Sequence, residues 1–232
     1  MKFLYLRRNE LTEIPSVLFT IEELQILDLR QNHLTKVNCS PRWQHLTLLM
    51  ISGNQIKELA FKEMSSLKTI QASDNQISVI KHVEDLKSCK VFDLKNNNIK
   101  FLPEEICSLK NLQKLYLDNN RITKLPDSLG DMSSLVTLTC NENELAELPQ
   151  TIGDLKLARL ELSFNRISVI PGEIGNMQSL RVLKLNDNNI SFLPEEVGKL
   201  MNLRYLYLQG NPLTTAEKKK IKRLCPQATI FF

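Results

Sequence analysis

A short pattern of leucines and an asparagine, repeated along the whole chain, constrains the fold more than any other feature of this sequence. Residues 112–126 read LQKLYLDNNRITKLP: three leucines, then an asparagine, then two more apolar residues and a proline. A repeat with a period in the twenties is typical of a solenoid built from stacked supersecondary units. The asparagines of the pattern recur at intervals of 21 to 23 residues, at Asn9, Asn32, Asn54, Asn75, Asn97, Asn120, Asn143, Asn165, Asn188 and Asn211.

The residue pattern of one repeat follows from how the repeat must pack against its neighbours. Leu115 and Leu117 alternate with polar residues, which predicts a strand whose leucines point into the interior. A unit this short cannot bury its own apolar side, so neighbours must stack on it and extend a continuous parallel sheet. The asparagine falls where the strand turns away. Its amide can satisfy backbone groups in its own turn and in the adjacent one.

Composition and charge agree with one continuous body. The chain has 232 residues, of which 42% are apolar and 24% charged, and its net charge of +4 gives no strong reason to expect nucleic acid as a partner. No apolar run reaches the roughly 18 residues of a membrane span. The apolar segment at the N-terminus is too short for a signal peptide.

The five cysteines stand at positions 39, 89, 107, 140 and 225. Their odd number and wide spacing resemble neither a disulfide framework nor a metal site. We therefore expect buried free thiols, a reducing compartment, a cytoplasmic location, and no cofactor or metal.

The segments that return the chain from one strand to the next differ between the two halves. From Phe101 onward they read LPEEICSL, LPDSLGDM, LPQTIGDL, IPGEIGNM and LPEEVGKL. Proline suits the first helical position, and the carboxylates that follow suit the positive end of a short helical turn. Glycines at 130, 153, 175 and 198 allow a left-handed or closely packed end to that turn. Repeats two to four lack this proline after Val37, Leu59 and Ile80. Their return segments are expected to be irregular, with a loop at 38–43 and Trp43 packed against it.

The sequence pattern LPxxIGxLxxLxxLxLxxNxL resembles the cytosolic leucine-rich repeats of the Ras-group family. The resemblance implies an α/β solenoid, a horseshoe with a parallel concave sheet and short convex helical turns. The closing residues 211–232 resemble the cap of cytoplasmic and bacterial leucine-rich-repeat proteins. The chain is thus predicted to hold ten repeats at 1–213, with no N-terminal cap, and a capping helix and strand at 214–232. Ras-group relatives are scaffolds that bind small GTPases, phosphatases or kinases.

Function in such an array is expected on the outward strand positions, which the repeat pattern leaves free. Aromatic and arginine side chains, the types enriched at interface hot spots, gather there in an N-terminal and a C-terminal region. For the C-terminal region, an ordinary sheet surface with a Glu161–Lys184 pair is the alternative. The predicted partner-binding residues of the concave face are Phe3, Tyr5, Arg7, Arg30, Ile26, Met50, Tyr116, Arg159, Phe164, Lys184, Tyr205 and Tyr207.

An enzyme is the rival class. His33, His45 and His82, taken with the cysteines, give no nucleophile–base–orienter set, and the seven glycines are too scattered for a phosphate loop. The sequence therefore predicts a non-enzymatic protein-binding scaffold, with a role in signalling as its expected setting. The alternative is a ligand-sensing or substrate-recognition domain of a larger protein or complex.

The two ends of the array carry their own expectations. Glu217–Arg223 is expected to form a capping helix with a solvated basic face, and binding to anionic membranes is the alternative. Met1, Leu4 and Leu6 already occupy the three leucine positions of the first repeat. An open end of this kind predicts self-association or coverage by a partner, with fraying of the first repeat as the alternative.

Overall fold

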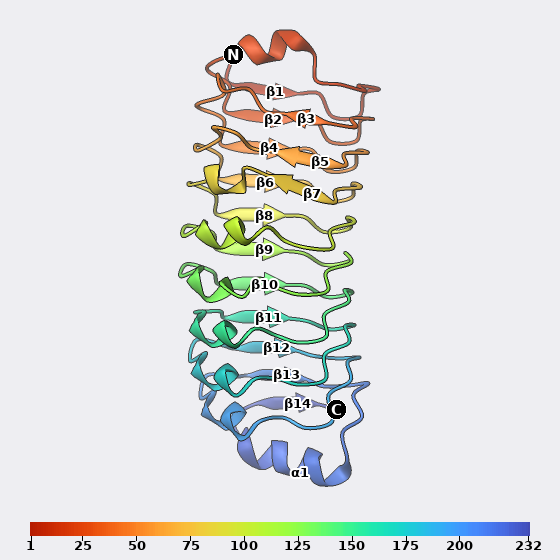
Figure 1. Cartoon of the computed structure of the whole chain (residues 1–232), viewed down its shortest axis with the longest axis vertical. Coiled ribbons are helices and arrows are strands. Elements are labelled where there is room, and N and C mark those ends of the chain that lie inside the picture. The colour runs from red at the N-terminus through yellow and green to blue at the C-terminus, as the bar shows by residue number, and fades with distance from the viewer.

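The computed structural model describes residues 1–232 as a stack of coils, each of which gives one strand to an eleven-stranded parallel sheet. Figure 1 shows these strands as successive rungs from the N-terminus at the top to the C-terminus near the bottom. This architecture confirms the predicted α/β solenoid. The strands, in sheet order, are β1 (Phe3–Tyr5), β2 (Ile26–Asp28), β4 (Leu48–Met50), β6 (Thr69–Gln71), β8 (Val91–Asp93), β9 (Lys114–Tyr116), β10 (Thr137–Thr139), β11 (Arg159–Glu161), β12 (Val182–Lys184), β13 (Tyr205–Tyr207) and β14 (Thr229–Phe231).

The core is one continuous apolar cluster that runs through all the coils. The middle residue of each strand lies beside the middle residue of the next, as Leu115 lies beside Leu138 and Leu138 beside Leu160. These three leucines are fully buried. The cluster contains 64 buried residues without a break, so the array is a single body rather than two domains.

From the second repeat onward, the asparagine of each repeat ties its turn to the preceding coil. Asn120 shows the arrangement: its Nδ2 donates to the backbone carbonyls of Leu117 and Leu94, each at 3.0 Å, and its Oδ1 accepts from the backbone N–H of Ile99 at 3.0 Å. Asn9, in the first repeat, donates only to carbonyls of its own turn. The asparagines therefore replace the backbone partners that the strands lose where they turn.

Each turn also contains one residue with a left-handed backbone, immediately before the asparagine. Only two of these residues are glycine, the type that adopts this conformation without strain. Phe164, at φ of 57°, is the bulkiest apolar example. The full series is Arg8, Gln31, Gly53, Asp74, Asn96, Asn119, Glu142, Phe164, Asp187 and Gly210.

Short 3₁₀ helices return the chain on the convex side, where the LP segments predict helical turns. In four of the five LP segments the proline lies just before the helix; Pro103, with ψ of 140°, is an example. The proline thus precedes the first helical position that the sequence suggests for it, because its backbone is still extended. The helices are η1 (Ser16–Thr20), η2 (Val83–Asp85), η3 (Glu104–Ser108), η4 (Leu129–Asp131), η5 (Gln150–Asp154), η6 (Gly172–Asn176) and η7 (Glu195–Lys199).

Glycine allows these helices to pack closely against each other. A Cβ added at Gly153 would lie 2.3 Å from the carbonyl oxygen of Glu173 in the next coil. Its backbone φ is not positive. Of the two roles that the sequence left open for this glycine, close packing is therefore the one the structure shows.

Repeats two to four form a second sheet that the sequence reasoning missed. Strands β3 (Val37–Asn38), β5 (Glu58–Ala60) and β7 (Val79–Lys81) pair in parallel where irregular segments were expected. Figure 1 shows them in a layer separate from the main sheet. In the LP repeats the corresponding position is a proline, which has no N–H to donate to a ladder, so regular pairing ends there.

The aromatic and sulfur side chains of the interior follow the prediction with one exception. Trp43 is fully buried, donates from Nε1 to the carbonyl of Leu18 at 2.9 Å, and packs its ring 5.5 Å from that of Phe19. All five cysteines are free thiols, and four of them are buried. Cys39 is partly exposed, because it lies in the loop that follows β3.

The C-terminal segment forms α1 (Thr215–Leu224) and β14, which pairs with β13. Thr214 caps the helix by accepting from the backbone N–H of Glu217 at 3.2 Å. Ile221 is buried in the core, and α1 lies across the lower end of the stack in Figure 1. No helix in the structure combines the length and apolar character needed to cross a membrane.

Candidate protein-binding face

The outward side chains of the main sheet form rows along the concave face. The first row holds the first residue of each strand and the central row its third residue, and a third row lies two positions beyond the central one, from Arg7 to Gln209. Strand pairing places Tyr5 beside Asp28, Asp28 beside Met50, and so on to Lys184 beside Tyr207. This is the register that the repeat spacing predicts. The central row reads Tyr5, Asp28, Met50, Gln71, Asp93, Tyr116, Thr139, Glu161, Lys184, Tyr207 and Phe231.

The N-terminal end of this face is apolar and exposed. Phe3 is 52% exposed and Tyr5 is 63% exposed. Ile26, beside Phe3, and Leu48, beside Ile26, are half-buried. Met50 was expected to share in this surface, but it is only 8% exposed. Little of its side chain is available to a partner, because it stands on a central strand with neighbours on both sides.

Asp28 is the buried acidic group of this end. It is 3% exposed, and its carboxylate receives two hydrogen bonds from the guanidinium of Arg30, Nε to Oδ1 at 2.9 Å and Nη2 to Oδ2 at 2.7 Å. Burial acts to raise the pKa of Asp28, but the hydrogen bonds from Arg30 and the charges of Arg30 and Arg7 outweigh it and lower that pKa below its ordinary value. Asp28 is therefore a charged, fixed group at neutral pH.

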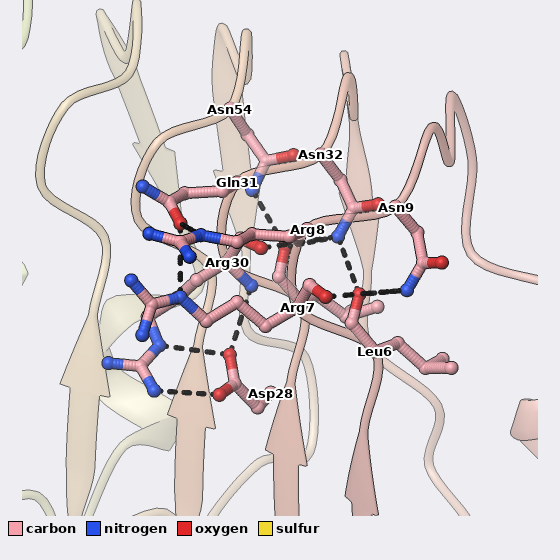
Figure 2. A network of polar contacts seen from close by, with 10 residues as sticks. Leu6, Arg7, Arg8, Asn9, Asp28, Arg30, Gln31, Asn32 and Asn54 are labelled. Carbon is pink, nitrogen blue, oxygen red and sulfur yellow. Dashed lines mark hydrogen bonds and ion pairs between the residues drawn. The ribbon is translucent and has the colours of Figure 1, made fainter.

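Arg7 and Arg8 lie beside this pair and contact the same neutral acceptor. Their Nε atoms donate to Oε1 of Gln31, at 3.0 Å from Arg7 and 2.8 Å from Arg8. Figure 2 shows the three guanidinium groups of Arg7, Arg8 and Arg30 with Gln31 and Asp28. Gln31 was not among the predicted site residues. It precedes the asparagine of its repeat, and comparing that position across all repeats would have drawn attention to it.

The middle of the face is polar and acidic. Asp118 accepts from the hydroxyl of Thr139 at 2.5 Å and from the backbone N–H of Asn141 at 2.9 Å, which links neighbouring coils. Burial raises the pKa of Asp93, although Lys95 opposes the shift. Tyr116, a predicted contact residue, lies under the ammonium of Lys95, whose Nζ is 5.3 Å from the ring centre.

The C-terminal end combines charged and aromatic groups. Glu161 pairs with Arg159 and with Lys184, the latter at 3.3 Å, so the cross-strand pair considered as the alternative is present. Lys184 also lies 5.7 Å from the ring centre of Tyr207. Tyr207 in turn stacks on Phe231, with ring centres 4.5 Å apart and planes 6° from parallel.

Two further aromatics of this end remain accessible. Tyr205 is partly exposed on the first row, and Phe164 is 55% exposed at the left-handed position of its turn. Phe231 was missed as a member of this surface. Extending the strand register through the closing segment would have included it, since β14 continues the sheet.

The histidines and cysteines are the residues that the sequence offers for catalysis or metal binding. No three side chains of His, Cys, Asp or Glu are grouped as metal ligands. Burial raises the pKa of the Cys89 thiol to about 12, which leaves very little thiolate at neutral pH. His82 is exposed on the convex side, where it lies 3.7 Å from Glu84.

Comparison with known proteins identifies the repeat. Family profiles described as "Leucine-rich repeat region" and "Leucine rich repeat" match residues 70–163 and 155–213. A probable disease resistance protein of Arabidopsis thaliana is 30% identical over 91 residues, which are 37% of this chain and 12% of that protein. The chain therefore spans only a small part of that relative's length.

Solved structures agree. A leucine-rich-repeat protein of Leptospira interrogans superposes with a TM-score of 0.94 at 33% identity, over 100% of this chain and 60% of that one. A plant peptide hormone receptor, RGFR1 in complex with RGF2, superposes with a TM-score of 0.78 at 28% identity, over 91% of this chain and 36% of the receptor. The chain is a leucine-rich-repeat protein, a class whose members generally serve as binding scaffolds and recognition domains.

Proposed function

We propose that this chain is a non-enzymatic scaffold that binds another protein through the concave face of its repeat array. The observation that carries the proposal is the exposed aromatic pair Phe3 and Tyr5 beside three arginines at one end of that face. Exposed apolar groups next to guanidinium groups are typical of interface hot spots. Exposing these aromatic rings to water is unfavourable, and a partner that covers them would remove that apolar surface from water.

The resemblance to Ras-group repeats supports a more specific version of this function. In that version the chain acts in signalling in the cytoplasm, and its partner is a small GTPase, a phosphatase or a kinase. The five free cysteines support a reducing compartment. The LP segments with their 3₁₀ helices support the repeat subtype.

A second candidate is a peptide-recognition domain of a larger protein. The receptor RGFR1, solved with the peptide RGF2, shares this fold over most of the present chain at 28% identity. This chain covers 36% of that receptor and 60% of the Leptospira protein, so a recognition domain within a longer protein fits the comparison.

Affinity capture with matched variants tests the scaffold function. The test variant carries Phe3→Ser and Tyr5→Ser on the concave face. The control carries Phe101→Ser and Phe192→Ser, two rings that are also largely exposed but lie on other rows of the coil. Proteins captured from extracts of the source cells should be retained by the control and lost by the test variant, with melting temperatures matched between the two. Equal capture by both variants would contradict the proposal.

A further inference from the structure

Three arginines lie at the N-terminal end of the concave face, and only Arg30 forms an ion pair. Arg7 and Arg8 follow β1, and Arg30 follows β2. Asp28 forms its ion pair with Arg30, and no acidic side chain pairs with Arg7 or Arg8. Arg7 and Arg8, drawn in Figure 2, therefore carry two positive charges that form no direct ion pair within the protein.

Arg7 and Arg8 are both anchored to one neutral atom. Each donates its Nε–H to Oε1 of Gln31, and neither forms any further hydrogen bond through its terminal nitrogens. Two like charges that meet at one uncharged acceptor repel each other. An anion placed against the free terminal nitrogens would attract both arginines and offset that repulsion, because guanidinium groups bind oxyanions by charge-assisted, often bidentate, hydrogen bonds.

A hollow beside the arginines provides space for such a group. Gly53, at φ of 70°, lines it, and a Cβ there would lie 3.3 Å from Cγ of Gln31, so a larger residue would crowd the side chain that holds Arg7 and Arg8. Asp74 supplies one acidic wall, and its carboxylate accepts from Asn96 at 2.6 Å and from Ser73 at 3.1 Å. The hollow has a volume of about 150 Å³ and is lined by Arg7, Arg30, Gln31, Ser52, Gly53 and Asp74.

The exposed rings lie on the same strand as the first arginine. Phe3, Tyr5 and Arg7 follow one another at alternate positions of the β1 segment, which places each about 7 Å from the next. A peptide extended along β1 would therefore set an apolar side chain over the rings and an acidic group over the arginines. The two groups would be roughly two to four residues apart in that peptide.

We infer that this end of the concave face is a carboxylate-binding site that recognises an extended acidic segment of a partner protein. The inference rests on the proposed scaffold function and names the chemistry of the partner. The pair formed by Asp28 and Arg30 shows that a carboxylate is held in bidentate fashion at this place in the fold. The bound carboxylate comes from an Asp or Glu side chain or from the C-terminus of the partner.

Selection from two random peptide libraries tests the site and separates these sources. In one library the peptides are fused at their C-termini, so that only side chains carry carboxylates. In the other the peptides end in a free C-terminal carboxylate. Selected peptides are then labelled, and their affinity for the whole chain is measured by fluorescence anisotropy at low and high salt.

Matched variants locate the binding. The test variant carries Arg7→Gln and Arg8→Gln, and the control carries Lys62→Gln and Lys219→Gln, which removes the same charge from exposed lysines that have no ion pair. We expect selected peptides to combine an acidic group with an apolar residue. They should lose about tenfold or more in affinity for the test variant, retain it for the control, and weaken as salt rises.

Several results would overturn the inference. These are the recovery of no binding peptide, an absence of acidic enrichment, or equal affinity for the two variants. The variant Tyr5→Ser separates a failure of the carboxylate site from a failure of the proposed scaffold function. Peptides that are lost with Tyr5→Ser but are insensitive to the arginine changes would leave the scaffold function standing and remove the carboxylate site.

Discussion

The carboxylate of Asp28 and the guanidinium of Arg30 form a bidentate ion pair, whose shorter hydrogen bond joins Nη2 to Oδ2 at 2.7 Å. The two residues stand at successive outward positions of one strand segment. The acidic partner is almost wholly buried, whereas Arg30 is partly exposed. Asp28 therefore depends on this pair for its charge.

Asp28→Asn is expected to destabilise the protein in a pH-dependent way. The pKa of Asp28 is lowered in the folded state from an ordinary value of 3.8, so its ionised form stabilises the fold above that pH. This stabilisation is lost as the pH falls through the lowered pKa. Thermal melts of the two proteins should differ at pH 7 and converge below about pH 3.8. A gap that stays constant into acid would show that the charge is not what the substitution removes.

The opposite effect on stability is expected when the carboxylate of Asp93 is replaced. Burial raises its pKa, and the nearby charges of Asp118 and Asp74 act in the same direction, so its ionised form weakens the fold at neutral pH. Asp93→Asn keeps an oxygen that can accept from the backbone N–H of Lys95. The variant should melt higher than the wild type at pH 7 and lose that advantage in acid. A lower melting temperature at pH 7 would mean that the pair with Lys95 is the stronger effect.

Loss of an asparagine in the middle of the array should be costly. Asn120→Ala leaves two buried carbonyls and one buried N–H without their partner, which we expect to lower the free energy of unfolding by about 1–3 kcal/mol. Asn9→Ala is the matched control, since Asn9 is exposed and bonds only within its own turn. Urea unfolding of both variants measures the difference. Equal effects would contradict the role of the asparagines in joining coils.

Glycine substitutions on the convex side should separate close packing from chain flexibility. Gly153→Ala would drive a methyl group to within 2.3 Å of a backbone oxygen, so the adjacent helices must shift apart, at roughly 1–3 kcal/mol. Gly172→Ala meets only the side chain of Glu196, at 3.5 Å or more, and should be neutral or slightly stabilising. If the two variants have the same melting temperature, the close approach at Gly153 is not a structural requirement.

Sequence alone was sufficient for the repeat, the strand register and the free thiols. The register follows because the buried leucines alternate strictly with outward residues, and a shift by one position would bury the polar set. The sequence did not predict the second sheet. That sheet forms because no proline stands at Asn38, Ala60 and Lys81, and because these segments pair between coils, which no single repeat reveals.

The candidate site was predictable in outline but not in detail. Exposed rings at Phe3 and Tyr5 follow directly from the outward pattern. The burial of Met50 and the convergence of Arg7 and Arg8 on Gln31 depend on side-chain packing across strands. Side-chain length and orientation decide such contacts, and residue spacing carries no information about them.

Site-directed photo-crosslinking shows whether the concave face is the surface that binds a partner. A benzophenone amino acid is placed in the source cells at position 5 or 205 on the concave face, or at position 101 or 192 on other rows of the coil. All four native residues are exposed aromatics, so each site accommodates the probe. Binding through the concave face predicts a discrete protein adduct from position 5, position 205 or both, and none from 101 or 192. Adducts that arise only from 101 or 192 would contradict it.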